Sequence, residues 1–153
     1  MNLVPSAARK LAEDLKGSLN GNEKAEIAVC PPYTALPGVL EVLKGTAIAV
    51  GAEDMHWEDQ GAFTGKISHD MLTDLGCQYV ILGHSEQRQY FHETDETVNK
   101  KTIKALQNGL VPIVCVGETL EERESNKTNT VVQSQLVGAL KDIADIKGTV
   151  IAY

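Results

Sequence analysis

The chain has 153 residues, of which 42% are hydrophobic and 23% are charged. This length and composition suit one soluble globular domain with a sizeable core. The formal net charge of −7 argues against nucleic acid or an anionic membrane surface as a partner. No apolar run approaches the ~20 residues of a membrane span. Three widely spaced cysteines without a C-x-x-C pair favour reduced thiols in the cytoplasm.

Helix-like and strand-like segments alternate along the chain. Apolar residues at helical spacing predict helices over 3–15 (ended by Gly17), 34–43 (capped by Thr34), 68–75 (between Ser68 and Gly76), 95–106 and 119–143. Short apolar runs predict strands over 27–30, 47–50, 79–82, 111–116 and 149–153.

The predicted strands are continuous apolar runs, which is typical of a parallel sheet buried on both faces. Five parallel strands joined by helices can form an open doubly wound sheet or part of a closed barrel. The pattern alone does not decide between these two α/β architectures.

A histidine follows the third predicted strand directly, where Gly83 is succeeded by His84, Ser85 and Glu86 before a polar turn and the helix from residue 95. Ligands and chemistry collect at this edge of an α/β sheet, so an imidazole there can act as an electrophile. The other interpretation is a histidine that only caps a turn.

Four segments resemble the triosephosphate isomerase family, in order over nearly the whole chain: residues 30–33, 51–65, 79–86 and 115–119. The family fold is an eight-stranded βα barrel of about 250 residues. The resemblance therefore implies an incomplete (β/α)8 barrel, with residues 1–153 forming a single partial domain that holds strands 2 to 6.

The resemblance also carries expectations about the two ends. Met1-Asn2 is similar to the tail of the family's strand-1 segment, so the family's catalytic lysine is expected just before residue 1. Tyr153 is similar to the residue before the family's catalytic glutamate. Residues 1–153 alone would then lack the lysine and the general base, and this fragment by itself is predicted to be inactive.

Residue roles follow from the same resemblance. His84 is expected to be the electrophile that polarises the substrate carbonyl, kept neutral by a helix N-terminus as is known for this family. Glu86 is expected to be a supporting carboxylate, or alternatively a first-turn acid favoured by the helix dipole. Ser85 is either a helix cap or an active-site hydrogen-bond partner, with capping favoured. Arg88 and Glu118 are expected to form a supporting salt bridge.

The polar excursion over residues 53–66 is long for a mere linker, and loops of this length usually have a function. In the family this loop enters the neighbouring subunit of a homodimer. Thr64 is then expected to reach the partner's active site, with Phe63 and Trp57 buried by contact. The alternative is a surface loop that packs on itself.

Two positions in this chain depart from the family pattern. The family commonly has glutamate where Lys66 stands and arginine where Gln87 stands, and those groups can pair across the dimer interface. That ion pair cannot form here, so the dimer would depend on other contacts.

The resemblance implies an intramolecular aldose–ketose isomerase of glycolysis and gluconeogenesis, which interconverts dihydroxyacetone phosphate and glyceraldehyde 3-phosphate through an enediolate. No cofactor and no metal are expected, since His56, His69 and His92 lack ligand spacing and are interpreted as surface or loop histidines. The alternative function is a non-catalytic barrel fragment that acts only as a folding or interaction module. No G-x-G-x-x-G motif supports a nucleotide-binding class.

Overall fold

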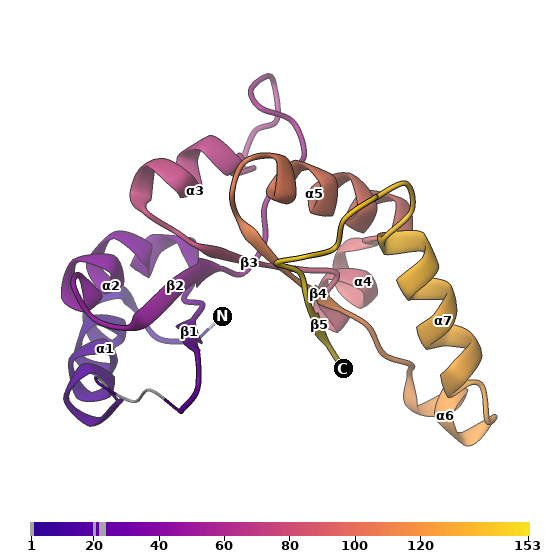
Figure 1. Cartoon of the computed structure of the whole chain (residues 1–153), viewed down its shortest axis with the longest axis horizontal. Coiled ribbons are helices and arrows are strands. Elements are labelled where there is room, and N and C mark those ends of the chain that lie inside the picture. Colours follow the sequence, from indigo (N-terminus) through magenta and orange to yellow (C-terminus); the bar gives the residue numbers. More distant parts are fainter. Residues whose placement is uncertain (1, 20, 22–23) are drawn as a thin grey trace. The chain divides into compact units, whose positions relative to one another are not determined.

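A computed structural model describes residues 2–19, 21 and 24–153 (Figure 1). The chain divides into two compact units, residues 1–80 and 81–153, and the division falls inside one strand. Each unit is described by itself. The prediction that residues 1–153 form a single domain stays a prediction.

The first unit holds two helices, α1 and α2, that lie side by side next to its strands (Figure 1). Tyr79 and the carboxylate of Glu26 are hydrogen-bonded, which ties the third strand to the start of the first and raises the pKa of Tyr79 to about 12. The elements of this unit are α1 (Pro5–Leu19), β1 (Ile27–Val29), the 3-10 turn η1 (Tyr33–Ala35), α2 (Leu36–Leu43), β2 (Ile48–Ala52), α3 (His69–Leu75) and the first half of β3 (Tyr79–Leu82).

The second unit packs two long helices, α5 and α7, against each other (Figure 1). The contact is close, because a Cβ placed on Gly138 of α7 would lie 2.6 Å from the Cβ of Asp95 on α5. The elements of this unit are the second half of β3, α4 (Ser85–Phe91), α5 (Asp95–Gln107), β4 (Val111–Cys115), α6 (Leu120–Glu124), α7 (Thr128–Ala139) and β5 (Val150–Ala152).

The strands pair in parallel and follow chain order, β1-β2-β3-β4-β5. In the first unit Ile27 is paired with Ile48, and in the second Ile113 is paired with Val150. This order lacks the reversal that defines a doubly wound sheet. The predicted parallel sheet is therefore confirmed, and of the two architectures left open the sequential order favours the barrel.

Side-chain caps made by hydroxyl groups fix the starts of α3, α5 and α6. Ser68 accepts a hydrogen bond from the Met71 N–H at the start of α3, as predicted, and Gly76 ends that helix with φ +98°. Thr94 and Thr97 cap the start of α5 reciprocally, and Thr119 and Glu122 do the same for α6. Each such pair satisfies N–H groups that the first helical turn leaves free.

Several predicted boundaries were wrong. Gly17 lies inside α1, where Ala8 and Ala12 are buried one turn apart and the packing outweighs the propensity of one glycine. Thr34 does not cap α2, because it lies inside η1. The supposed polar turn after His84 contains α4, a helix without a buried side chain and hence without an apolar period to detect. The last long helix ends at Ala139, before residue 143.

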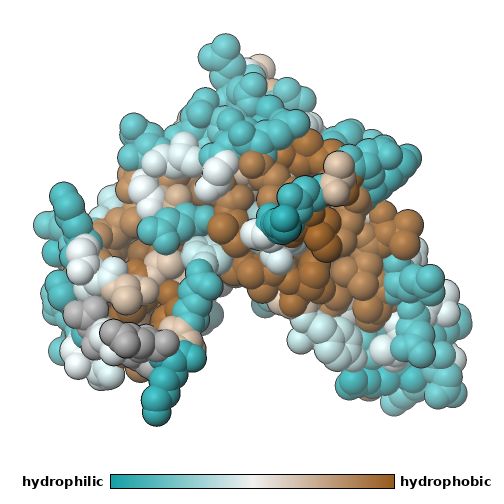
Figure 2. All heavy atoms as spheres, viewed as in Figure 1, coloured by the Kyte–Doolittle hydropathy of each residue, from teal (hydrophilic) through white to brown (hydrophobic). Residues whose placement is uncertain are grey.

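Apolar side chains are unevenly covered in the second unit. Val98, Ala105, Val114 and Ala139 are fully buried between its helices and strands. In contrast, Figure 2 shows hydrophobic residues gathered on the visible face around β4 and β5, where Val150 and Ile151 are 44% and 42% exposed. Among the described residues no helix is long and apolar enough to cross a membrane.

Candidate active site

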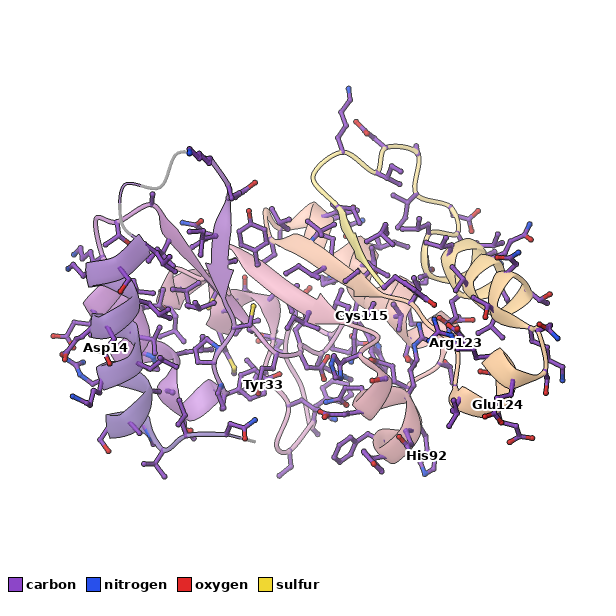
Figure 3. The ribbon with its side chains drawn as sticks, turned by 90° about the horizontal axis from the view of Figure 1, so that it is seen from below. Asp14, Tyr33, His92, Cys115, Arg123 and Glu124 are labelled. Atoms are coloured by element: carbon purple, nitrogen blue, oxygen red, sulfur yellow. The ribbon has the colours of Figure 1, made fainter. Side chains whose placement is uncertain are left out.

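The ends of β3, β4 and β5 in the second unit surround an open groove of about 640 Å³. These are the carboxyl ends of parallel strands, the edge where α/β proteins place their ligands. Figure 3 labels two of the lining residues, Cys115 at the end of β4 and Arg123 on α6. The lining also includes Gly83, His84, Arg88, Gly117, Glu118 and Tyr153.

His84 stands at the N-cap of α4, so the imidazole itself caps the helix. Its Nδ1 accepts a hydrogen bond from the Glu86 N–H at 3.2 Å. A nitrogen that accepts such a bond carries no proton, so the neutral ring bears its proton on Nε2. The side chain is 44% exposed at the groove. The two interpretations of His84 are therefore compatible, because capping uses Nδ1 and leaves the Nε2–H free to donate.

Glu86 and Ser85 occupy the first turn of α4, and both are exposed. A Glu86 carboxylate oxygen lies 3.8 Å from His84 Nδ1. This distance exceeds that of a hydrogen bond, and Nδ1 already accepts from the backbone. Ser85 is not the cap, since His84 takes that position. Glu86 thus acts on α4 as a first-turn acid, while its role toward a lysine stays a prediction.

The predicted salt bridge between Arg88 and Glu118 is wrong. Arg88 pairs with Asp95, Nη1 to Oδ1, at 2.7 Å, and Glu118 pairs with Arg123, Oε1 to Nε, at 3.0 Å. The prediction failed because it assigned α4 to a loop. With α4 formed, the guanidinium of Arg88 meets the first residue of α5.

Glu118 is a second well-ordered group of the groove, with only 4% of its side chain exposed. Its own backbone N–H and the Thr128 hydroxyl donate to the carboxylate, and Tyr153 and Arg123 add to these interactions. Together they lower the pKa of Glu118 below its ordinary value. Glu118 is therefore an anionic support that holds α6, α7 and the end of β5 together.

Cys115 and Gly117 complete this wall of the groove. Burial raises the pKa of the Cys115 thiol, which disfavours the thiolate that a nucleophile needs. Gln135 on α7 holds Gly117 from both sides, because its amide oxygen accepts from the Gly117 N–H at 2.8 Å and its amide nitrogen donates to the Gly117 carbonyl at 3.0 Å. Nothing in the local sequence around Gln135 indicated this contact.

A buried ion pair was also missed. Glu93 and Lys101 are 4% and 7% exposed, and their charged groups are in direct contact. The other carboxylate oxygen of Glu93 accepts from the Gly83 N–H at 3.0 Å. Lys101 lies on the buried face of α5 next to Val98 and Thr102. Its helical spacing from these residues could have indicated in the sequence that it is buried.

The excursion after β2 lies in the first unit and is ordered by its own contacts. The His56 ring lies 4.1 Å from Trp57 and 4.6 Å from Phe63, measured between ring centroids. Phe63 is 42% exposed and Thr64 is exposed, whereas Trp57 is half-buried. The loop therefore packs partly on itself, and its predicted entry into a second subunit stays a prediction.

Of the histidines interpreted as surface or loop residues, His56 lies in the loop but is buried, and His69 is buried at the start of α3. His56 is enclosed by the aromatic contacts of the loop, and His69 lies between Asp59, whose Oδ1 is 2.8 Å from Nε2, and Asp70, whose Oδ1 is 3.2 Å from Nδ1. His92 is exposed, as predicted. Within the ranges 2–19, 21 and 24–153, no group of three or more His, Cys, Asp or Glu side chains is arranged so that it could hold a metal ion.

Comparisons with known proteins give one consistent match. A sequence profile described as triosephosphate isomerase matches residues 1–153. The triosephosphate isomerase of Alkaliphilus oremlandii is 52% identical over 94% of this chain and 57% of its own length. That of Clostridium botulinum is 51% identical over 100% of this chain and 62% of its own.

A solved structure agrees with these matches. The crystal structure of triosephosphate isomerase from Bartonella henselae superposes with a TM-score of 0.91 at 39% identity, covering 100% of this chain and 63% of that one. The fold is thus an incomplete (β/α) barrel. The chain spans about three fifths of the length of the relatives that it matches.

Proposed function

Because the chain belongs to the triosephosphate isomerase family, we propose that the whole protein interconverts dihydroxyacetone phosphate and glyceraldehyde 3-phosphate. The observation that carries the proposal is the state of His84. Its Nδ1 accepts a hydrogen bond from the Glu86 N–H, so the Nε2–H remains at the groove as a donor.

The proposed reaction is a proton transfer between adjacent carbons. A general base removes the proton from the carbon next to the carbonyl, while the Nε2–H of His84 donates a hydrogen bond to the carbonyl oxygen, where negative charge develops. The resulting enediolate is reprotonated on the neighbouring carbon. The imidazole moves a proton between the two enediolate oxygens through Nε2, which gives its proton to one oxygen and takes the proton of the other.

Other parts of the site are proposed from the family. The general base and the lysine are expected outside residues 1–153, with Glu86 supporting the lysine. We further propose a homodimer in the cytoplasm, joined through residues 53–66, with Thr64 reaching the partner's site and Phe63 and Trp57 buried there. The exposure of Phe63 and Thr64 supports this part of the proposal.

The substitution His84→Gln in the full-length protein tests the role of His84. A group that acts on charge developing in the transition state should appear in turnover, so we expect kcat to fall by about 10²–10⁴ with little change in KM. His92→Asn is the control, because His92 is exposed with φ +56° and asparagine tolerates that conformation. A change confined to KM would return His84 to a capping role only.

A second test concerns residues 1–153 expressed alone. This polypeptide should show no turnover, because His84 is the single main catalytic side chain that the family assigns to it, and loss of a positioned base alone forfeits about 10²–10⁴ in rate. The purified polypeptide, prepared from a host that lacks its own isomerase, is assayed against the full-length protein. Measurable turnover of glyceraldehyde 3-phosphate would disprove this.

A further inference from the structure

Both peptide groups that flank Gly83 are held by charged side chains. The Gly83 N–H donates to Glu93 Oε2 at 3.0 Å, and the Gly83 carbonyl accepts from Arg88 Nε at 2.8 Å. The first group belongs to the peptide plane before Gly83, and the second belongs to the plane that leads into His84. Because peptide planes are rigid, fixing both of them fixes φ and ψ of Gly83 and with these the direction in which His84 leaves the strand.

Glu93 and Arg88, the two charged side chains that bind Gly83, each have a counter-ion on α5. Lys101 contacts Glu93, and Asp95 binds Arg88 at 2.7 Å. The Glu93 and Lys101 side chains are 4% and 7% exposed, so this pair is held away from water. A buried ion pair is weak evidence for stability, since desolvation offsets much of the attraction. Stability alone therefore does not explain why a carboxylate and an ammonium group are buried behind the candidate electrophile.

The conformation of Gly83 explains why it needs such contacts. Its φ is +71°, and a Cβ there would lie 3.0 Å from both Arg88 Nη2 and Val98 Cγ2. The positive φ and the close neighbours favour glycine, but glycine by itself is flexible and specifies no direction. A hydrogen-bond acceptor on the N–H supplies the missing constraint.

We propose that Glu93 is a positioning residue for His84. Its carboxylate accepts the Gly83 N–H, Lys101 keeps that carboxylate in place, and the fixed glycine aims the His84 ring into the groove. This inference rests on the proposed function for its kinetic consequence, but the orientation of His84 can be measured without activity.

Two matched double variants of the full-length protein test the proposal. Glu93→Gln with Lys101→Met removes both charges but keeps an acceptor for the Gly83 N–H. Glu93→Met with Lys101→Met removes the same charges and keeps a side chain of similar length, but it leaves that N–H without an acceptor. A displacement of about 1 Å can cost about 10²-fold in rate. We call the variant with Glu93→Met the Met pair and the variant with Glu93→Gln the Gln pair. We expect the Met pair to lower kcat at least ~10-fold with KM within ~3-fold, and the kcat of the Gln pair to stay within ~3-fold of the parent.

The ring signals of His84, assigned by their loss in His84→Gln, give an independent readout by NMR. They should be unchanged in the Gln pair and shifted or broadened in the Met pair. Equal His84 signals and equal kcat in both pairs would overturn the proposal. If the Met pair does not fold, the Gln pair decides, because a kcat ~10-fold below the parent would contradict the positioning role. If the parent itself shows no isomerase activity, the proposed function fails while the ring signals still test the position of His84.

Discussion

The segments that follow β2 and β3 are both polar, yet they are ordered in different ways. Residues 53–67 are held by backbone hydrogen bonds, such as His56 N–H to the Ile67 carbonyl at 2.8 Å, and by the rings around His56. Residues 83–95 are held by charged side chains that bind main-chain groups, with Glu93 and Arg88 on the two sides of Gly83.

This difference matches what each segment is proposed to do. The first segment presents Phe63 and Thr64 outward, as a surface that meets a partner needs to do. The second fixes the backbone from which one side chain must approach a substrate within a fraction of an ångström. Charge-assisted hydrogen bonds to main-chain groups hold those groups in a defined geometry, so they suit the second task more than the first.

The largest expected effect is on the free energy of unfolding, and it distinguishes two lysines, one beside each segment. Lys101→Met leaves Glu93 buried without its counter-ion and should lower the free energy of unfolding by about 3–5 kcal/mol. Lys66→Met, at an exposed position in the first segment, should change it by about 0.5 kcal/mol or less. Denaturant unfolding of the full-length protein measures both. Similar values for the two variants would mean that the Glu93–Lys101 pair is not effectively buried.

A glycine of each segment gives a second comparison. Gly65 has φ +86° and open space around it, so Gly65→Ala should cost only the left-handed strain of about 1–2 kcal/mol. Gly83→Ala at φ +71° meets Arg88 and Val98 at 3.0 Å and should add about 1–3 kcal/mol of crowding to a similar strain. Thermal unfolding of both variants gives the difference. An equal loss would show that the surroundings of Gly83 give way easily.

Phe63→Ala is expected to act on assembly more than on the folded chain. Within one chain it removes the contact with His56, worth about 0.5–1.5 kcal/mol for a ring pair. In a homodimer that buries Phe63, the loss should be about 2 kcal/mol or more, which is roughly a 30-fold weaker dimer. Sedimentation equilibrium measures it, with the exposed Gln133→Ala on α7 as control. Unchanged association would remove Phe63 from the interface.

The smallest effect concerns Glu118 and depends on pH. Because its pKa is lowered in the folded chain, its contribution is complete above the pKa of the unfolded chain and is lost as the pH falls through the folded value. Glu118→Gln should therefore destabilise the protein at pH 7 and cost progressively less in acid. Glu124→Gln, at an exposed position on α6, is the control. Parallel pH profiles for the two variants would contradict the assignment.

The sequence predicted the strands better than it predicted the site. Continuous apolar runs such as 47–50 and 79–82 indicate buried strands, and the helix at 95–106 is visible from the helical spacing of its apolar residues. His84 was found from its place after a strand and from the family resemblance. The partner of Arg88 was not, since it depends on α4, a helix with no buried side chain, and Glu118 instead pairs with Arg123 on α6.

The reciprocal cap of Thr94 and Thr97 has a consequence for the order in which the chain folds. A contact between residues three apart costs little chain entropy. A helix that starts with such a contact can therefore form before distant strands pair. Helix α5 carries Asp95 and Lys101 with it. If α5 forms first, the charges that oppose Arg88 and Glu93 are arranged along one helix before the end of β3 reaches it. A local signal at the start of α5 thus sets the template on which the backbone before His84 takes its final conformation.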